Sequence, residues 1–215
     1  MLYPLHWTLS LLATVLRLGA GGAPGRPKTA DGQDLPVLYE FESCPHCRIT
    51  REAVSAAGRS VLVMPCPKGG ERFRPDVTEK GGKAQFPFLW DTAAGEGAYE
   101  SRSLAREVLS NASTGRPIVH WLPVVNGILS SYASLARGMA GTFPQASKSP
   151  AKPLIYQGAE RSPAGRLVKE RLCALELPYI WQPSPSGPTL EDPNTGETLS
   201  GGATIRAYLR ATYAV

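Results

Sequence analysis

Cysteine and charge are both scarce in this sequence. Four cysteines among 215 residues are too few for the disulfide framework of a small secreted protein, which favours one local cysteine motif. Charged residues make up 19% of the chain against 42% hydrophobic residues, so the composition excludes intrinsic disorder. The formal net charge of +5 comes from scattered cations rather than a basic stripe, so we expect no nucleic-acid partner.

Long hydrophobic runs are missing as well. Residues 1–16 and 118–136 carry no Asp, Glu, Lys or Arg, but both are shorter than the roughly 20 apolar residues of a membrane span, and Pro123 and Gly127 interrupt the second. The first segment has neither the positive start of a signal peptide nor the Arg and Ser content of a transit peptide. We expect both segments to form helices that pack against the rest of the protein, with membrane association as the alternative.

The chain contains an internal repeat. Residues 37–52 resemble residues 155–170, and Pro45, Arg48 and Glu52 fall on Pro163, Arg166 and Glu170, each 118 positions later. Pro87 falls on Pro188, only 101 positions later, so the second copy is shorter by 17 residues. An internal repeat indicates one structural unit written twice. Here the unit is an uncharged segment, a linker and a small domain.

The residue pattern predicts the order βαβαββα for the first copy. We expect strands at residues 35–41, 61–64, 87–90 and 97–99, and helices at residues 45–58, 75–80 and 101–109. The first of these helices has proline in its first turn, a regular apolar spacing and Gly58 at its end. The second copy lacks the residues of the short helix at 75–80.

The motif Cys44-Pro45-His46-Cys47 lies where the first strand meets the first helix. At a helix start, unpaired N–H groups and the helix dipole stabilise a thiolate, which is the reactive form of cysteine. Two intervening residues allow Cys47 to attack a mixed disulfide formed on Cys44. His46, when protonated, and Arg48 add positive charge near the sulfur. The placement therefore favours redox chemistry at Cys44.

Two other interpretations of this motif are open. A zinc site needs a second Cys or His pair at matching spacing, but Cys66 and Cys173 are isolated, and His6 and His120 are distant in sequence. We therefore expect no metal. The motif could also be purely structural. We expect Cys66 and Cys173 to be buried, unreactive thiols.

Pro87 is the second informative residue. A proline that opens a buried strand after a bulky apolar residue is unusual unless the peptide bond is cis and the turn has a purpose. In the βαβαββα order, this proline faces the cysteine motif across the edge of the sheet. A trans proline at the start of an edge strand is the alternative.

These residues resemble a known family. The cysteine motif after a strand, Phe-Pro-Phe-Leu-Trp-Asp at residues 86–91 and Tyr-Glu-Ser at residues 99–101 resemble glutaredoxin and the N-terminal domain of glutathione transferases. With residues 38–45, 65–68, 73–75 and 81–87, the chain more closely resembles plant and algal proteins with two tandem glutathione S-transferase N-terminal domains. The resemblance covers about residues 16–110 and 135–215.

The resemblance implies an α/β architecture of two tandem thioredoxin-like domains. The first would occupy residues 35–112 after an apolar helix and linker at residues 1–34. The second, degenerate and truncated, would occupy residues 153–215 after an apolar helix and linker at residues 113–152. The resemblance also implies a chloroplast location, although no transit peptide is evident in the sequence.

The resemblance further implies a glutathione site. Cys44 would be the nucleophile and Cys47 the resolving thiol. The cis-proline Pro87 would follow a Phe86 backbone that pairs with the cysteinyl part of glutathione, as an added strand does. The residues for the two ends of the peptide would be Glu100 and Ser101 for the γ-glutamyl end, and Lys83 or Gln85 for the glycyl carboxylate. An ordinary helix cap explains Glu100 and Ser101 equally simply.

Departures from the family narrow the expected function. No transferase-type helical domain follows, which argues against conjugation of hydrophobic substrates. The second copy has Ser162 and Gly165 in place of the two cysteines and Gly201-Gly202 in place of Glu-Ser. We expect a glutaredoxin-like thiol–disulfide oxidoreductase, with glutathione as co-substrate and glutathione or a disulfide-containing protein as partner.

Two other functions fit the same residues. A non-catalytic glutathione- or peptide-binding module would use the surface of the fold without turnover. A glutathione-ligated iron–sulfur carrier is disfavoured by the resolving cysteine Cys47.

Overall fold

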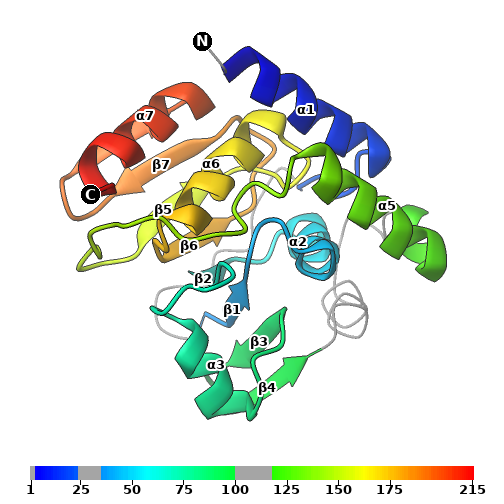
Figure 1. Ribbon diagram of the computed structural model, residues 1–215, viewed down its shortest axis with the longest axis horizontal. Helices are drawn as coiled ribbons and strands as arrows, with labels where there is room; N and C mark the ends of the chain where they lie inside the picture. Colours follow the sequence, from blue (N-terminus) through cyan, green and yellow to red (C-terminus); the bar gives the residue numbers. More distant parts are fainter. Residues whose placement is uncertain (1–2, 24–34, 100–117) are drawn as a thin grey trace.

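A single mixed sheet forms the centre of the molecule (Figure 1). The computed structural model describes residues 3–23, 35–99 and 118–215. Its eight strands lie in the order β4-β3-β1-β2-β6-β5-β7-β8. The strands are β1 Val37–Glu40, β2 Val61–Pro65, β3 Phe88–Asp91, β4 Glu96–Tyr99, β5 Leu154–Gln157, β6 Tyr179–Gln182, β7 Thr189–Asp192 and β8 Glu197–Ser200. The helices are α1 Tyr3–Leu16, α2 Pro45–Ala57, α3 Arg74–Gly81, α5 Pro123–Ala136, α6 Pro163–Ala174 and α7 Gly202–Tyr213, with a 3-10 turn η1 at Ile118–Trp121.

Local signals set the ends of these elements. Helix α2 begins with the side chain of Cys44 as its N-cap and Pro45 in its first turn. It ends at Gly58, whose φ of 65° is left-handed and whose N–H donates to the carbonyl oxygens of Ser55 and Val54. The predicted strands and helices of residues 35–99 are therefore confirmed, with ends that shift by one or two residues. The predicted helix at residues 101–109 lies outside the described residues.

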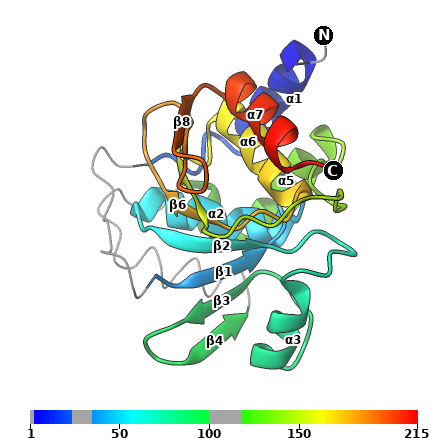
Figure 2. The same ribbon diagram turned by 90° about the vertical axis from the view of Figure 1, so that its left-hand side faces the viewer.

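The two halves of the sheet, the first made of β1–β4 and the second of β5–β8, have the same connectivity. Strand β1 pairs in parallel with β2 and antiparallel with β3, and β5 pairs in the same way with β6 and β7. No helix lies between β6 and β7, as the shorter second copy predicts. The halves meet where β2 pairs antiparallel with β6, with Val61 opposite Trp181 and Val63 opposite Tyr179. Figure 2 shows β2, β1, β3 and β4 stacked in that order away from this join.

One hydrophobic core serves both halves. The larger cluster of buried side chains combines residues of α2 and β2, such as Ile49 and Val63, with residues of β5 and β6, such as Tyr156 and Trp181. A smaller cluster around Phe88 fills the space under α3. The second copy therefore does not rely on a core of its own. It shares apolar burial with the first copy, which compensates for its missing helix.

The two uncharged segments form helices, as expected. Each helix packs against the half of the molecule that it does not precede in the sequence. Helix α1 lies against α6 of the second half, whereas α5 lies against α2 of the first half, and the two helices also contact each other. Ser10 of α1 donates to the carbonyl oxygen of Pro163 at 2.9 Å, and Ser130 of α5 donates to that of Pro45 at 2.7 Å. Within the described residues, no helix combines the length and hydropathy needed to cross a membrane.

Two equivalent buried ion pairs fix these helices. Arg17, at the end of α1, pairs with Glu52 of α2 at 2.6 Å, and Arg137, at the end of α5, pairs with Glu170 of α6 at 2.7 Å. Each arginine also donates to a carbonyl oxygen of the other uncharged helix, Arg17 to Asn126 and Arg137 to His6. These contacts show that α1 and α5 run antiparallel, because the end of each helix meets the first turns of the other.

Substitution of Arg17 tests how much these ion pairs contribute to the free energy of unfolding. Arg17→Leu leaves the buried carboxylate of Glu52 without its guanidinium, so we expect unfolding to become easier by about 3–5 kcal/mol. The exposed Arg59 provides the control, and Arg59→Leu should stay within about 0.5 kcal/mol of the parent. Urea denaturation of both variants gives the comparison. Equal midpoints for the two would contradict this role of the buried pair.

The pH dependence of stability tests the same site. Burial raises the pKa of Glu52, but hydrogen bonds from Arg17 and His120 outweigh it and lower the pKa from 4.5 to about 2. A depressed pKa stabilises the folded state above the unfolded value, and this contribution, about 3 kcal/mol, is lost as the pH falls from about 4.5 to about 2. In Glu52→Gln, the free energy of unfolding should change less over this interval. An unchanged profile would disprove the assignment.

Candidate functional site

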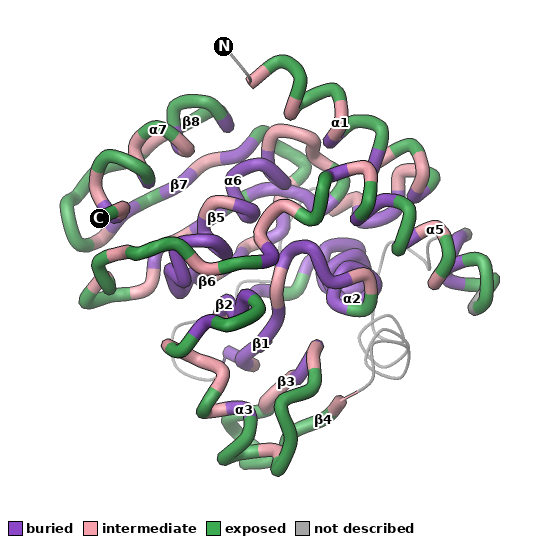
Figure 3. The backbone as a smooth tube through the Cα atoms, viewed as in Figure 1, coloured by how far each residue is buried: buried purple, intermediate pink, exposed green. Residues whose placement is uncertain are grey.

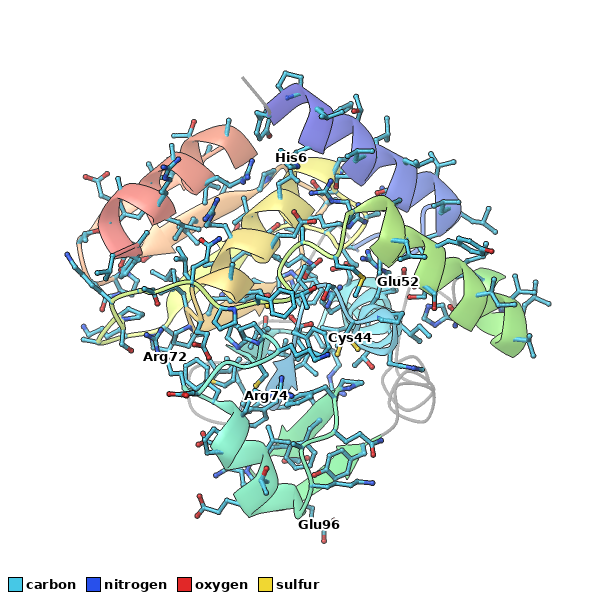
Figure 4. The ribbon with its side chains drawn as sticks, in the orientation of Figure 1. His6, Cys44, Glu52, Arg72, Arg74 and Glu96 are labelled. Atoms are coloured by element: carbon cyan, nitrogen blue, oxygen red, sulfur yellow. The ribbon has the colours of Figure 1, made fainter. Side chains whose placement is uncertain are left out.

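The cysteine motif occupies the junction of β1 and α2 (Figure 4). Cys44 has extended backbone angles, φ −69° and ψ 121°, so its side chain turns back over the first turn of the helix. The backbone N–H of Cys47 donates to the Cys44 sulfur at 3.3 Å. Cys44 retains 5% of its surface exposed and Cys47 none. Cys44 is therefore the sulfur of the motif that another molecule can reach.

The two sulfurs have opposite acidities. The pKa of Cys44 is lowered, first by a hydrogen bond from the Cys47 thiol and further by backbone N–H groups and the charge of Arg51, which together outweigh burial. The pKa of Cys47 is raised well above its ordinary value by burial, by its hydrogen bond to Cys44 and by the charges of Cys44 and Glu40. The site thus combines a sulfur of increased acidity, Cys44, with a neighbouring thiol, Cys47, that holds its proton more tightly.

The cations around the motif are arranged differently from the sequence expectation. His46 is exposed. Arg48 is buried and points into the protein, with Nη1 3.9 Å from Glu160, and burial and the charges of Arg166 and Arg51 lower its pKa to about 9. The guanidinium whose charge lowers the pKa of Cys44 is that of Arg51. Sequence reasoning missed Arg51, although its place one helical turn after Cys47 is a signal that could have identified it.

Arg51 belongs to a buried charge cluster beneath the site. It pairs with Glu40 of β1, with Glu42 of the loop that follows and with Glu160 of the second half. Lys169 of α6 pairs with Glu160 and lies 3.9 Å from Glu42. Each of these side chains is at most 1% exposed. The cluster is therefore a contact between the halves that is buried away from the molecular surface.

The strand that faces the motif has the predicted turn. The Phe86–Pro87 bond is cis, as predicted. The Phe86 ring contacts the Phe41 ring edge-on at 6.0 Å between centroids, and the guanidinium of Arg74 lies 4.5 Å above it. This turn therefore lies against the loop that leads into the cysteine motif.

The other predicted glutathione contacts lie farther along the surface or outside the description. Lys83 and Gln85 are exposed, and the Lys83 ammonium lies 4.6 Å above the ring of Tyr99. Glu100 and Ser101 are outside the described residues. The structure thus places Phe86 against the loop that precedes Cys44, and it leaves Lys83 and Gln85 exposed on the surface.

The second half repeats the backbone geometry of the cysteine motif but has no cysteine there. Ser162 is the N-cap of α6 with φ −67° and ψ 118°, and it accepts the N–H of Gly165 at 3.1 Å, as Cys44 accepts that of Cys47. Among the described residues, Phe86–Pro87 is the only cis peptide bond, so Pro188 does not repeat it. The second half therefore has a hydroxyl where the first has a thiol.

The remaining cysteines are unreactive by position. Cys66 is fully buried, and burial raises its pKa. Cys173 is 1% exposed, burial raises its pKa, and it accepts the N–H of Glu42 at 3.4 Å. Among the described residues, no group of three His, Cys, Asp or Glu side chains is placed to hold a metal ion.

Comparison with known proteins gives one match. Residues 38–117 match the family model of the glutathione S-transferase N-terminal domain. No curated protein and no solved structure matches the chain. The matched segment begins in β1 and includes the cysteine motif and the cis-proline. Residues 38–117 are thus similar to a glutathione S-transferase N-terminal domain, and the α/β fold agrees with a thioredoxin-like architecture.

Variants of Cys47 test the acidity of Cys44. Cys47→Ala removes the hydrogen bond that contributes most to the low pKa of Cys44, so that pKa should rise. Cys47→Ser keeps a donor at this position and should preserve most of the lowering. The rate of alkylation by iodoacetamide against pH measures the effect, because the buried Cys66 and Cys173 do not compete. Identical midpoints in the parent and both variants would refute the proposed contact.

Proposed function

We propose that this protein is a glutathione-linked thiol–disulfide oxidoreductase with Cys44 as its nucleophile. The observation that supports this most directly is the lowered pKa of Cys44 at the start of α2, beside a protonated Cys47. A structural cysteine pair would not need this difference in acidity. The match of residues 38–117 to a glutathione transferase domain supports glutathione as the co-substrate.

The first step is a thiol–disulfide exchange. The Cys44 thiolate attacks the glutathione sulfur of a mixed disulfide, the substrate leaves as a thiolate that takes a proton from solvent, and Cys44 becomes bonded to glutathione. A second glutathione thiolate then attacks the glutathione sulfur on Cys44, which releases oxidised glutathione and restores the Cys44 thiolate. Overall, one mixed disulfide and one glutathione thiol become one substrate thiol and one oxidised glutathione. Each step breaks one S–S bond and forms another, so the electrons balance.

Cys47 has a supporting role in this scheme. Its raised pKa keeps it as a thiol, which donates a hydrogen bond to the Cys44 thiolate. A thiol is a poor nucleophile, so attack by a second glutathione is favoured over closure of a Cys44–Cys47 disulfide. Cys47 becomes the resolving thiol when a base removes its proton.

We further propose how glutathione lies in the site. The Phe86 backbone before cis-Pro87 would pair with the cysteinyl part, and Glu100 and Ser101 would receive the γ-glutamyl end. Lys83 or Gln85 would meet the glycyl carboxylate from the rim. Helix α5 contacts the motif through the hydrogen bond from Ser130 to the Pro45 carbonyl oxygen, and only 5% of Cys44 is exposed. A slender tripeptide suits so small an exposed area better than a disulfide inside a folded protein.

The second half is proposed to be a degenerate thioredoxin-like domain in tandem with the first, and it serves as a scaffold. Its hydroxyl at Ser162 cannot exchange disulfides, but its charges and strands hold the first half in place. The resemblance to plant and algal tandem proteins supports a chloroplast location for this activity.

A non-catalytic binding module is the second candidate. The observation that favours it is the burial of Cys44, of which only 5% is exposed. Such a module would bind glutathione without turnover.

Substitution of each cysteine separates these functions. Cys44→Ser should lower the reduction of a glutathione mixed disulfide, coupled to glutathione reductase, by about 10³-fold or more. Cys47→Ser should keep most of the turnover, and Cys66→Ala serves as the control for a buried cysteine outside the motif. Full activity in Cys44→Ser would overturn the proposal. Binding of glutathione without turnover in the parent protein would favour the binding module.

A further inference from the structure

The outer side of α1 and α5 is an unusual surface. We call it the apolar helix face and define it by Leu5, Leu12 and Val15 of α1 and Val124, Ile128 and Leu135 of α5, which are 46–69% exposed. The two helices lie side by side at one edge of the molecule, and Figure 3 shows their outward turns exposed while α2 and α6 behind them are buried. Single exposed apolar residues are normal, but an adjoining set on two helices indicates an interaction surface.

Neither helix carries a formal charge. Tyr3–Leu16 and Pro123–Ala136 contain no Asp, Glu, Lys or Arg. The carboxylates that approach these helices, Glu52 and Glu170, are buried in ion pairs with Arg17 and Arg137. The apolar helix face therefore offers a partner no charge of its own.

The charges at the edge of this face are positive. Arg206 of α7 lies 5.8 Å above the ring of Tyr3 at the start of α1, and exposed Arg161 accepts a hydrogen bond from Thr14 through its carbonyl oxygen. Neither arginine has a carboxylate partner among the described residues. An arginine from another part of the chain therefore lies near each end of α1, and neither arginine is paired with a carboxylate of the described residues.

A cavity lies beside the same edge. His6, Arg171 and Arg206 line a hollow of about 190 Å³ between α1, α6 and α7. Glu170 also lines it, but both of its oxygens accept hydrogen bonds from Arg137 at 2.7 Å. The unbalanced charge of the hollow is positive, and its volume accommodates a phosphate group.

We propose that the apolar helix face docks on the surface of a lipid bilayer that contains anionic phospholipids. Both helices would lie in the plane of the interface, with their apolar side chains at the boundary of headgroups and acyl chains and with Arg161 and Arg206 beside the phosphates. A second copy of the chain fits this surface less well, because a two-fold contact would bring the same arginines of both copies to one rim. The proposal is independent of the redox activity.

Vesicle sedimentation tests the docking. The whole protein is mixed with vesicles of phosphatidylcholine alone or of phosphatidylcholine with phosphatidylglycerol. We expect binding to the anionic vesicles, and we expect higher salt to weaken it, because the Debye length falls from about 10 Å at 0.1 M to about 3 Å at 1 M ionic strength. A protein that stays in the supernatant with both vesicle types would overturn the proposal.

Two sets of variants separate the apolar and the charged contributions. Val15→Asp with Ile128→Asp places carboxylates on the exposed face without touching the core, and it should weaken vesicle binding by about tenfold or more. Ala94→Asp with Thr198→Asp adds the same charge at exposed positions on neither helix and should bind more tightly than the first pair. Arg161→Gln with Arg206→Gln should lose about fivefold per arginine on anionic vesicles only.

Other outcomes contradict the docking. Equal binding by both aspartate pairs would show that the apolar helix face is not the contact. A dimer in size-exclusion chromatography with light scattering that Val15→Asp and Ile128→Asp dissociate, without vesicle binding by the parent, would assign the face to a second copy instead. Soluble inorganic phosphate that abolishes vesicle binding at constant ionic strength would assign the arginines to a free anion and contradict their contact with lipid.

Discussion

The contact of Arg51 with three carboxylates is the interaction on which the rest of the structure depends. Glu40 and Glu42 come from the first half and Glu160 from the second, and all four side chains are removed from water. Buried charges are tolerated only when each is balanced, and the loss of one partner is costly. The halves therefore cannot separate without exposing or unbalancing the cluster. The same guanidinium lowers the pKa of Cys44, so one residue links the assembly of the sheet to the acidity of the thiol.

Helix α5 contacts both the cysteine motif and the buried ion pair of Arg17. Its inner side donates a hydrogen bond from Ser130 to Pro45, and its first turns accept a hydrogen bond from Arg17. Its outer side is apolar and exposed. A helix without a charged residue can serve these contacts because Asn126, Ser130 and Ser134 are buried on its inner side. Docking of its outer side would hold the cysteine motif close to the docked surface.

The two halves repeat the same backbone arrangement and the same helix contacts, but they differ in the side chain at the reactive position. The contacts of Ser10 with Pro163 and of Ser130 with Pro45 are equivalent, as are the ion pairs of Arg17 and Arg137. At the start of α2 and α6, however, the same backbone angles hold a thiol in one half and a hydroxyl in the other. The physical frame of a thiolate site is thus present twice, and only one copy has a side chain that can ionise near neutral pH.

The sequence by itself determined the local structure and the reactive motif. Helix α2, its cap at Cys44, its end at Gly58 and the cis bond at Pro87 follow from residues within a few positions of each other, and the repeat with its missing helix is visible by inspection. Long-range contacts decided the rest: the pairing of β2 with β6, the crossed packing of α1 and α5, and the shared core. Arg48 and Arg51 are three positions apart, carry the same charge and both approach Glu160, yet Arg51 is the one whose charge lowers the pKa of Cys44. The spacing from Cys47 makes Arg51 a candidate, but its carboxylate partners come from both halves of the sheet, and only the tertiary structure brings them together.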